Sequence, residues 1–265
     1  ETSTASLSVS SSENHQPRST TPTFPRRTAS SFLRQVCLLL LPLVLSGVII
    51  LIFAEKERRN IEKAELSSTL HLYTKDSRVC ATDDLKQFET YETIHQVPSS
   101  HMVAHCGACS NCSTIQDMTI YAGTTKTLTD GATWCSTRAY LASFFLWRGM
   151  DIYRNVAAKC LRETVGFTEA CQECWVEDMA CSIQACVFTC LKSVYLKREP
   201  KNDPVTGALN ECLSCDEKLC GPDFLKCSGS NRRRQGIESD IARGGAEICQ
   251  SVTMDWTKVV EESDN

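Results

Sequence analysis

Three cysteines and one histidine form the stretch of this chain whose spacing most suggests chemistry. They stand together in His105-Cys106-Gly107-Ala108-Cys109-Ser110-Asn111-Cys112. Cys106 and Cys109 have the separation of a thiol–disulfide redox pair, in which the N-terminus of a following helix stabilises the first thiolate. Such a pair requires a strand before it, a full helix after it and a βαβ frame, and the sequence shows no strong βαβ alternation. Redox catalysis by this pair is therefore the alternative, and structural disulfides are the main interpretation.

The same segment also has two formal metal-site interpretations. Zinc would use His105 with the three cysteines, and it would require a cytosolic region in which the thiols stay reduced. A Cys-x-x-Cys-x-x-Cys run opens bacterial iron–sulfur motifs, but the fourth cysteine followed by proline is missing here. The sequence also has no Ser/His/Asp arrangement, HExxH motif, glycine-rich phosphate loop or acidic calcium loop. We expect no catalytic set, no metal and no cofactor.

Cysteine content indicates the compartment. Sixteen of the 17 cysteines lie between Cys80 and Cys249, a density typical of disulfide scaffolds in oxidising compartments. The number is even, so eight disulfides account for all of them, although the pairing cannot be deduced from the sequence. The expected structural cysteines are Cys80, Cys106, Cys109, Cys112, Cys135, Cys160, Cys171, Cys174, Cys181, Cys186, Cys190, Cys212, Cys215, Cys220, Cys227 and Cys249.

An uncharged stretch of 19 residues, Val36–Ala54, divides the chain. A membrane-spanning helix needs roughly 20 apolar residues, whereas the apolar part of a secretory signal peptide has only about 7 to 15. The bulky Ile52 also occupies a position where signal cleavage requires a small residue. We therefore favour an uncleaved transmembrane signal anchor at residues 35–55 over a cleaved signal peptide or a buried core helix. Cys37 lies within it, as a free thiol or a palmitoylation site.

The orientation of this anchor follows from the cysteines. Basic residues flank the stretch equally on both sides, so the positive-inside rule gives no preference. A lumenal or extracellular C-terminal region allows eight disulfides, whereas a cytosolic one would leave 16 thiols unexplained. We expect a cytosolic N-terminus and a lumenal or extracellular C-terminal domain. The sequon Asn111-Cys112-Ser113 makes Asn111 a possible glycosylation site on that side.

Composition divides the chain into five segments. We expect a disordered Ser/Thr/Pro-rich tail at 1–34, the anchor at 35–55, a helical stalk and linker at 56–79, a cysteine-rich helical domain at 80–250 and an acidic C-terminal tail at 251–265. Within the linker and the start of the domain, residues 73–105 have little periodicity and read as loop with one short strand or helix. The fold class is mainly α, with one transmembrane helix and a disulfide-rich helical ectodomain.

The first long helix of the domain is predicted from an apolar seam. Small and apolar residues recur at alternating steps of four and three from about Asp130 to Arg162, before a plausible cap at Gly166. Cys135 and Cys160 lie on this seam, about 37 Å apart along a straight helix. They cannot pair with each other unless Gly149 breaks the helix into a hairpin.

Further helices follow from capping signals. A short helix is expected after Ser113, and a second long helix runs from the cap Thr168 to about Tyr195. A third begins at Asp203-Pro204 and stops at Gly221-Pro222. A last helical piece is expected at 237–242.

Net charge and basic runs limit the partners. The formal net charge is -4 with 23% charged residues, so nothing steers the protein toward nucleic acid. The run Arg232-Arg233-Arg234 is read as solvated or ion-paired with Glu238 and Asp240, with an anionic head group or a processing site as sharper alternatives. The expected partners are the membrane, as an integral component, and an unknown protein or glycan ligand.

Several motifs carry a resemblance. The HCGACSNC segment, Gly166-Phe167-Thr168 followed by the cysteines up to Trp175, and Cys220-Gly221-Pro222 resemble a group of cysteine-rich, membrane-anchored proteins from microalgal genomes. The resemblance covers about His101 to Cys249 and implies no assigned activity. Our leading hypothesis is a non-enzymatic single-pass protein whose ectodomain acts in binding or assembly. A membrane-tethered oxidoreductase and a lipid-binding helical domain are the alternatives.

Overall fold

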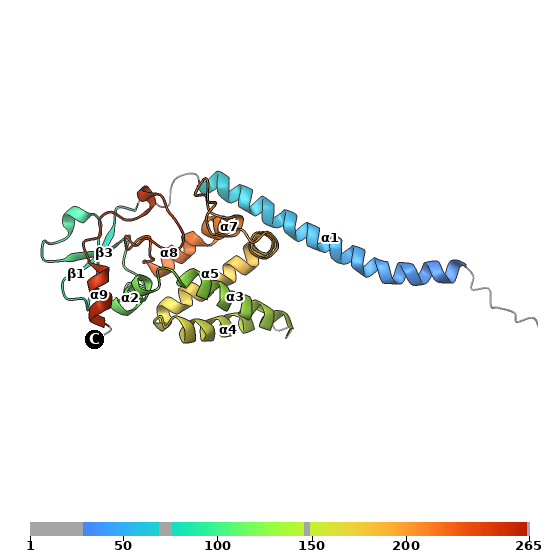
Figure 1. The fold of residues 1–265 in the computed structure, drawn as a ribbon, viewed down its shortest axis with the longest axis horizontal. Coiled ribbons are helices and arrows are strands. Elements are labelled where there is room, and N and C mark those ends of the chain that lie inside the picture. Colours follow the sequence, from blue (N-terminus) through green and yellow to red (C-terminus); the bar gives the residue numbers. More distant parts are fainter. Residues whose placement is uncertain (1–28, 69–75, 146–148, 264–265) are drawn as a thin grey trace, which may run out of the picture. The chain divides into compact units, whose positions relative to one another are not determined.

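The computed structural model describes the backbone of residues 29–68, 76–145 and 149–263, and the side chains of 44–64, 76–144 and 149–261 (Figure 1). Residues 1–28 of the expected tail lie outside this description. The chain separates into two compact units, Glu1–Ile49 and Ile50–Asn265. The site and all disulfides belong to the second unit.

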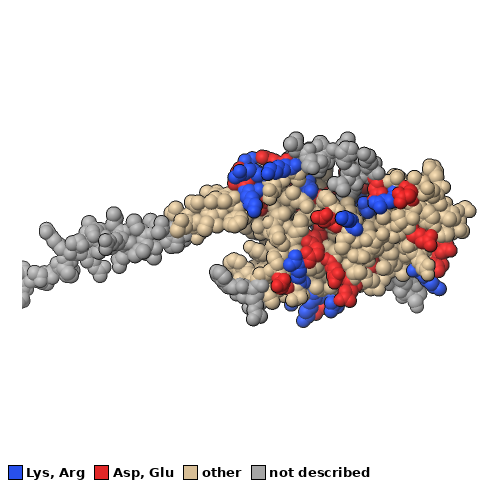
Figure 2. Space-filling model, turned by 180° about the vertical axis from the view of Figure 1, so that it is seen from behind, with Lys and Arg blue, Asp and Glu red and all other residues tan. Residues whose placement is uncertain are grey.

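The longest helix, α1, spans Ala29–Ser68. Its residues Val48–Phe53 are about half exposed or more, and among the described side chains of this helix the charged ones lie at Glu55 and beyond (Figure 2). The side chains of residues 35–43 in the expected anchor, Cys37 included, lie outside the described part. Within the described residues, no single helix has the length and apolarity of a membrane span, and only the bent pair Glu169–Ala185 and Val187–Leu196 meets that test jointly.

Two helices form an antiparallel hairpin where one long helix was expected. Helix α3 covers Leu128–Phe145 and α4 covers Gly149–Thr164, and Gly149 has a φ of 69° that only glycine adopts readily. The chain therefore reverses, and Cys135 and Cys160 come together with a Cα–Cα distance of 5.5 Å. The single seam predicted from the sequence is in fact two facing seams.

Helix α5, Glu169–Ala185, packs across this hairpin and completes the main core. Tyr153, Ala157 and Leu161 of α4 are fully buried there against Ala180 and the half-buried Ile183. Small residues line α3 at this contact, so the helices approach closely. The core of the domain is accordingly helical.

The second long helix is bent where it was expected to be straight. After α5 come α6, Val187–Cys190, and a π-helical turn, η2, at Leu191–Leu196, and the direction changes by 86°. Cys186 ends α5 with a φ of −129°, outside the helical range. The bend allows cysteines on both sides of it to reach different neighbours.

The third helix starts later than predicted. Helix α7 is Glu211–Leu219, capped by the Asn210 side chain, which accepts from the Leu213 N–H at 2.9 Å. Asp203 instead accepts the N–H groups of Val205 and Thr206 in a turn. Gly221 and Pro222 do not stop the helical region, since they open a further helix, α8, at Gly221–Ser228.

A small antiparallel sheet occupies the region expected to be mostly loop. Strands β1, Val79–Thr82, β2, Glu89–Tyr91, and β3, Met102–Cys106, pair in the order β2-β1-β3, with a short 3₁₀ turn, η1, at Ile94–Gln96. These strands are too short for a clear alternation of apolar and polar residues. Helix α2, Ile115–Gly123, follows the sheet and is capped by Thr114, one residue after the expected Ser113.

The C-terminal segment also departs from expectation. Residues 237–242 are not helical, a 3₁₀ turn, η3, occupies Gly245–Glu247, and helix α9 spans Trp256–Ser263 within the expected acidic tail. Met254 and Trp256 are buried beside Met118 of α2. The Thr253 and Met254 N–H groups donate to the Val103 carbonyl, which ties this segment to β3.

Candidate functional site

The Cys106/Cys109 pair is not a redox pair in this structure. Cys106 is bonded to Cys249 and Cys109 to Cys80. The reason is local: Gly107, with a φ of 88°, turns the chain directly after β3 and separates the two side chains. The next helix, α2, begins only at Ile115, so no helix N-terminus adjoins Cys106 to stabilise its thiolate. This pairing gives the oxidoreductase interpretation of Cys106 and Cys109 no support.

His105 is buried as a structural residue. Its Nδ1 lies 2.9 Å from the Cys106 carbonyl oxygen, and its Nε2 lies 2.8 Å from the Ser113 hydroxyl. Burial lowers the pKa of His105 to about 4, so the ring is neutral at physiological pH. Both ring nitrogens are engaged and the three neighbouring cysteines are oxidised, which excludes the zinc arrangement built from these residues.

Eight disulfides use all 16 cysteines from Cys80 to Cys249. Four of them connect α5 and its end to other parts of the domain, so this helix is the centre of the framework. Two more join the sheet region to itself and to the C-terminal segment. The pairs are Cys80–Cys109, Cys106–Cys249, Cys112–Cys171, Cys135–Cys160, Cys174–Cys227, Cys181–Cys220, Cys186–Cys215 and Cys190–Cys212.

Asn111 of the predicted sequon is exposed, but its neighbours are not. Cys112 is fully buried in a disulfide, and Ser113 is 6% exposed with its hydroxyl engaged by His105 and by the Ser110 N–H. The Asn111 amide nitrogen lies 3.6 Å from the sulfur of Cys174 and 3.7 Å from that of Cys227. Attachment of a glycan at Asn111 would therefore have to precede the burial of Cys112 and Ser113.

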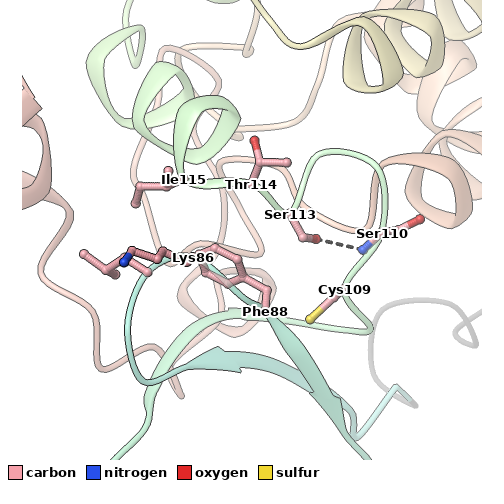
Figure 3. Close-up of a pocket in the computed structure, with 8 residues that line it drawn as sticks. Lys86, Phe88, Cys109, Ser110, Ser113, Thr114 and Ile115 are labelled. Atoms are coloured by element: carbon pink, nitrogen blue, oxygen red, sulfur yellow. Dashed lines mark hydrogen bonds between the residues drawn. The ribbon is translucent and has the colours of Figure 1, made fainter.

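An open hollow of about 540 Å³ lies between the β1–β2 loop and the N-terminus of α2 (Figure 3). Residues 85–88 form one wall, with the Phe88 ring and Lys86, and residues 109–115 form the other. The Cys109 sulfur in this lining belongs to the Cys80–Cys109 disulfide. The Ser113 hydroxyl accepts a hydrogen bond from the Ser110 N–H at 2.8 Å. The lining contains no histidine or carboxylate, the groups that most often serve in acid–base catalysis.

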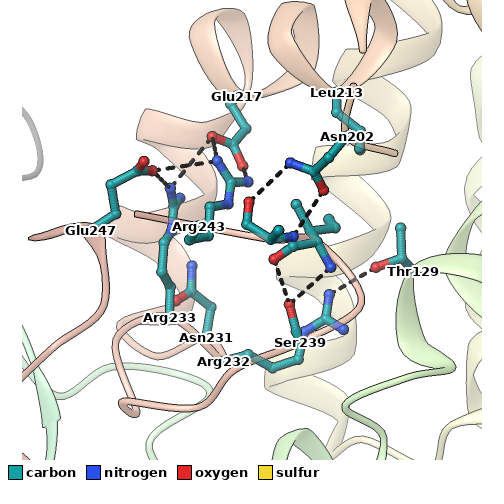
Figure 4. Close-up of polar contacts among 12 residues, drawn as sticks. Thr129, Asn202, Leu213, Glu217, Asn231, Arg232, Arg233, Ser239, Arg243 and Glu247 are labelled. Atoms are coloured by element: carbon teal, nitrogen blue, oxygen red, sulfur yellow. Dashed lines mark hydrogen bonds and ion pairs between the residues drawn. The ribbon is translucent and has the colours of Figure 1, made fainter. Parts of the chain in front are cut away.

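The arginine run forms internal ion pairs. Arg232 contacts Asp240 at 2.6 Å, as predicted from the sequence. Arg233 contacts Glu217 and Glu247 (Figure 4). All three side chains of the run are only 10–14% exposed. Arg243 joins the same network through Glu217 and Glu247. This network fixes the C-terminal segment against α7, so neither head-group binding nor processing at the run is supported.

Two carboxyls that sequence reasoning missed lie between α5 and α7. The Ser182 hydroxyl donates to Asp216, and within the described residues Asp178 Oδ1 is buried without a hydrogen-bond partner. Burial raises the pKa of Asp216 to about 6. The pKa of Asp178 is raised well above its ordinary value, mainly by burial and secondly by the charge of Asp216. The burial of Asp178 could have been predicted from the sequence, because on α5 it lies between Trp175 and Met179, which pack in the main core.

The Asp216 carboxyl predicts a contribution to stability that is present in mild acid and lost toward neutral pH. A carboxyl whose pKa is raised by folding stabilises the folded state below its unfolded pKa, and this contribution is lost as the pH rises through the folded pKa. For Asp216 the window runs from about pH 4 to about 6. We expect the Asp216 contribution to the free energy of unfolding to fall by roughly 2 to 3 kcal/mol between pH 4 and pH 7.5, while the lowered pKa of His105 acts in the opposite direction.

Denaturant titrations at several pH values measure this loss. Asp216→Asn should remove this contribution, so that its free energy of unfolding relative to the unaltered protein rises between pH 4 and pH 7.5. The control Asp151→Asn, on an exposed position of α4, should leave the pH dependence intact. The same pH dependence in Asp216→Asn and in the unaltered protein would contradict the prediction.

The fold and these contacts define a mainly helical, disulfide-stapled, cysteine-rich domain. A model of a family of unknown function, DUF8771, matches residues 154–251 of the chain. The match begins within α4, contains α5, α7 and α8, and ends just after Cys249. No curated protein and no solved structure gives a significant match to the chain. The sheet and α2 lie outside the matched residues but are bound to them by Cys112–Cys171 and Cys106–Cys249.

Proposed function

We propose that the chain is a non-enzymatic, single-pass membrane protein whose disulfide-stapled domain acts in binding or assembly. The observation that carries this proposal is the use of every cysteine from Cys80 to Cys249 in a disulfide, which fits an oxidising, secretory compartment. The uncharged stretch Val36–Ala54 has the length of a signal anchor that would deliver the domain there. The N-terminus would then remain in the cytosol.

A partner for this domain would be a protein or a glycan. The hollow beside Phe88 and Lys86 supports this view, because an aromatic ring with nearby amine and hydroxyl groups suits a saccharide or a peptide side chain. The oxidoreductase alternative has less support, since Cys106 and Cys109 are in different disulfides. Binding is therefore the function that the geometry supports best.

Protease protection in sealed microsomes tests the topology. With an epitope at each end, we expect the C-terminal epitope to survive proteolysis and the N-terminal one to be lost. The double variant Leu45→Arg/Ile49→Arg should abolish insertion, because each arginine at a helix centre costs about 3 kcal/mol. Its control, Arg58→Lys, changes an exposed residue just beyond the stretch and should insert normally. Digestion of the C-terminal domain in sealed vesicles would contradict the proposal.

A further inference from the structure

An exposed apolar surface runs along one side of α3. Trp134, Leu141 and Phe144 are 61%, 48% and 63% exposed. The first two lie seven residues apart, on the same side of the helix, with Thr137 between them. Large exposed apolar side chains that cluster in this way mark an interaction surface more often than chance.

The same surface continues onto η2. The hydroxyls of Thr137 and Tyr195 lie 2.5 Å apart, which places the η2 tyrosine beside the stripe on α3. Tyr195 is 50% exposed, and its neighbours Leu191 and Leu196 are 49% and 74% exposed. We call the six residues Trp134, Leu141, Phe144, Leu191, Tyr195 and Leu196 the apolar face.

One contact places the apolar face beside the end of the predicted anchor. The Glu57 carboxylate, only 7% exposed, accepts the N–H groups of Phe188 and Thr189 at 3.1 and 2.8 Å. Glu57 follows Ala54 by three residues, or about 4.5 Å along a helix. The start of helix α6 is therefore held next to the C-terminal end of the apolar stretch. The residues of η2 follow α6 directly in the chain.

The residues near the end of the apolar stretch are of the types found at a membrane–water interface. The residues that follow the stretch are charged and exposed to water: Arg58 and Arg59, four and five residues after Ala54, have 59% and 64% side-chain exposure and pair with Glu55 and Glu62. Tryptophan and tyrosine, both present in the apolar face, are the residues enriched at membrane–water interfaces. We propose that the apolar face rests on the bilayer surface beside the anchor and holds the domain against the membrane. This inference rests on the proposed membrane anchoring.

Bromine-labelled lipids test the proposal in the full chain. The protein is reconstituted into vesicles of bromophosphatidylcholine, and the emission of Trp134 is taken as the difference between the protein and its Trp134→Phe variant. We expect the labelled lipid to remove roughly half of this emission, as for an indole at the interface. Leu191→Glu/Leu196→Glu should restore most of it by lifting the face from the bilayer, and Glu57→Ala should do so in part.

The matched control is Ile94→Glu, on η1 beside the sheet, where Ile94 is 37% exposed. This variant should leave the quenching of Trp134 unchanged. Release of the protein by alkaline carbonate would show that the anchoring itself fails. Retention in the bilayer with unquenched Trp134 would overturn only the docking of the apolar face. Protection of Trp134 from both bromolipid and aqueous acrylamide would also overturn it, in favour of a second copy or another protein on this face.

Discussion

Replacing Cys112 and Cys171 together by alanine should lower the free energy of unfolding by about 4 kcal/mol, on the chain-entropy estimate for a closed loop of this length. Their disulfide closes a separation of 59 residues and joins the segment before α2 to the start of α5. Both cysteines are fully buried, in a core cluster that also contains Tyr121, Leu128 and Phe167. The loss should therefore combine a freer unfolded chain with a small cavity in the folded one.

Equilibrium unfolding in guanidinium under non-reducing conditions measures this effect. The double replacement leaves no unpaired thiol, so reshuffling does not obscure the result. The control, Cys190→Ala/Cys212→Ala, opens a shorter separation of 22 residues at the half-buried end of the helical region, and it should cost less. A Cys112/Cys171 variant as stable as the unaltered protein would contradict the central position that we assign to this bond.

Asp117→Asn should destabilise the domain by about 3 kcal/mol, because a buried carboxylate loses its charge-assisted hydrogen bonds. Asp117 is fully buried and serves the caps of two helices. Its Oδ1 accepts the Thr168 N–H at 2.7 Å, and its Oδ2 accepts the hydroxyls of Thr168 and Thr114 at 2.7 and 2.6 Å. Those threonines are the N-caps of α5 and α2. One carboxylate thus fixes the start of both helices.

Thermal unfolding with intact disulfides provides the measurement for Asp117. An asparagine at this site keeps the shape but presents an N–H₂ group toward hydroxyls that now donate to a carboxylate oxygen. Asp223→Asn is the matched control, because Asp223 occupies the first turn of α8 and is exposed. It should change the stability by a few tenths of a kcal/mol. Equal effects of the two substitutions would show that Asp117 does not link the caps.

The helical, disulfide-rich character of the domain was predictable because cysteine density and apolar periodicity are properties of the sequence itself. The seam from Asp130 to Arg162 was detected, but whether it was one helix or two depended on the backbone at Gly149. Its positive φ is permitted by glycine and not dictated by it. The Cys135–Cys160 pairing follows from that single conformational choice.

The sheet and the pairing of the Cys106 segment could not be predicted from local pattern. Strands of three to five residues show little alternation, and β3 is completed by contacts with Thr253 and Met254 from the far end of the chain. Cys106 is bonded to Cys249, at a sequence separation of 143, and no local spacing indicates such a partner. The Cys-x-x-Cys motif was therefore informative about oxidation and misleading about catalysis.

The buried acidic residues illustrate a second kind of limit. Asp117 fitted the capping pattern after Thr114, but its bond to Thr168 joins positions 51 residues apart. Asp178 occupied an apolar side of α5, and only the packing of α7 showed that Asp216 is near enough to raise its pKa. Tertiary contacts of this kind decide whether a charged residue is exposed or becomes part of the core.

The most direct test of a disulfide-stapled domain in an oxidising compartment is a disulfide map of the native protein. The protein is isolated from membranes with its free thiols alkylated at the moment of lysis, digested without reduction and analysed by mass spectrometry. We expect the eight linked pairs, with Cys106 joined to Cys249 and Cys80 to Cys109, and no alkylated cysteine from Cys80 to Cys249. Rapid alkylation of these cysteines, or a Cys106–Cys109 bond, would contradict both the fold and the compartment.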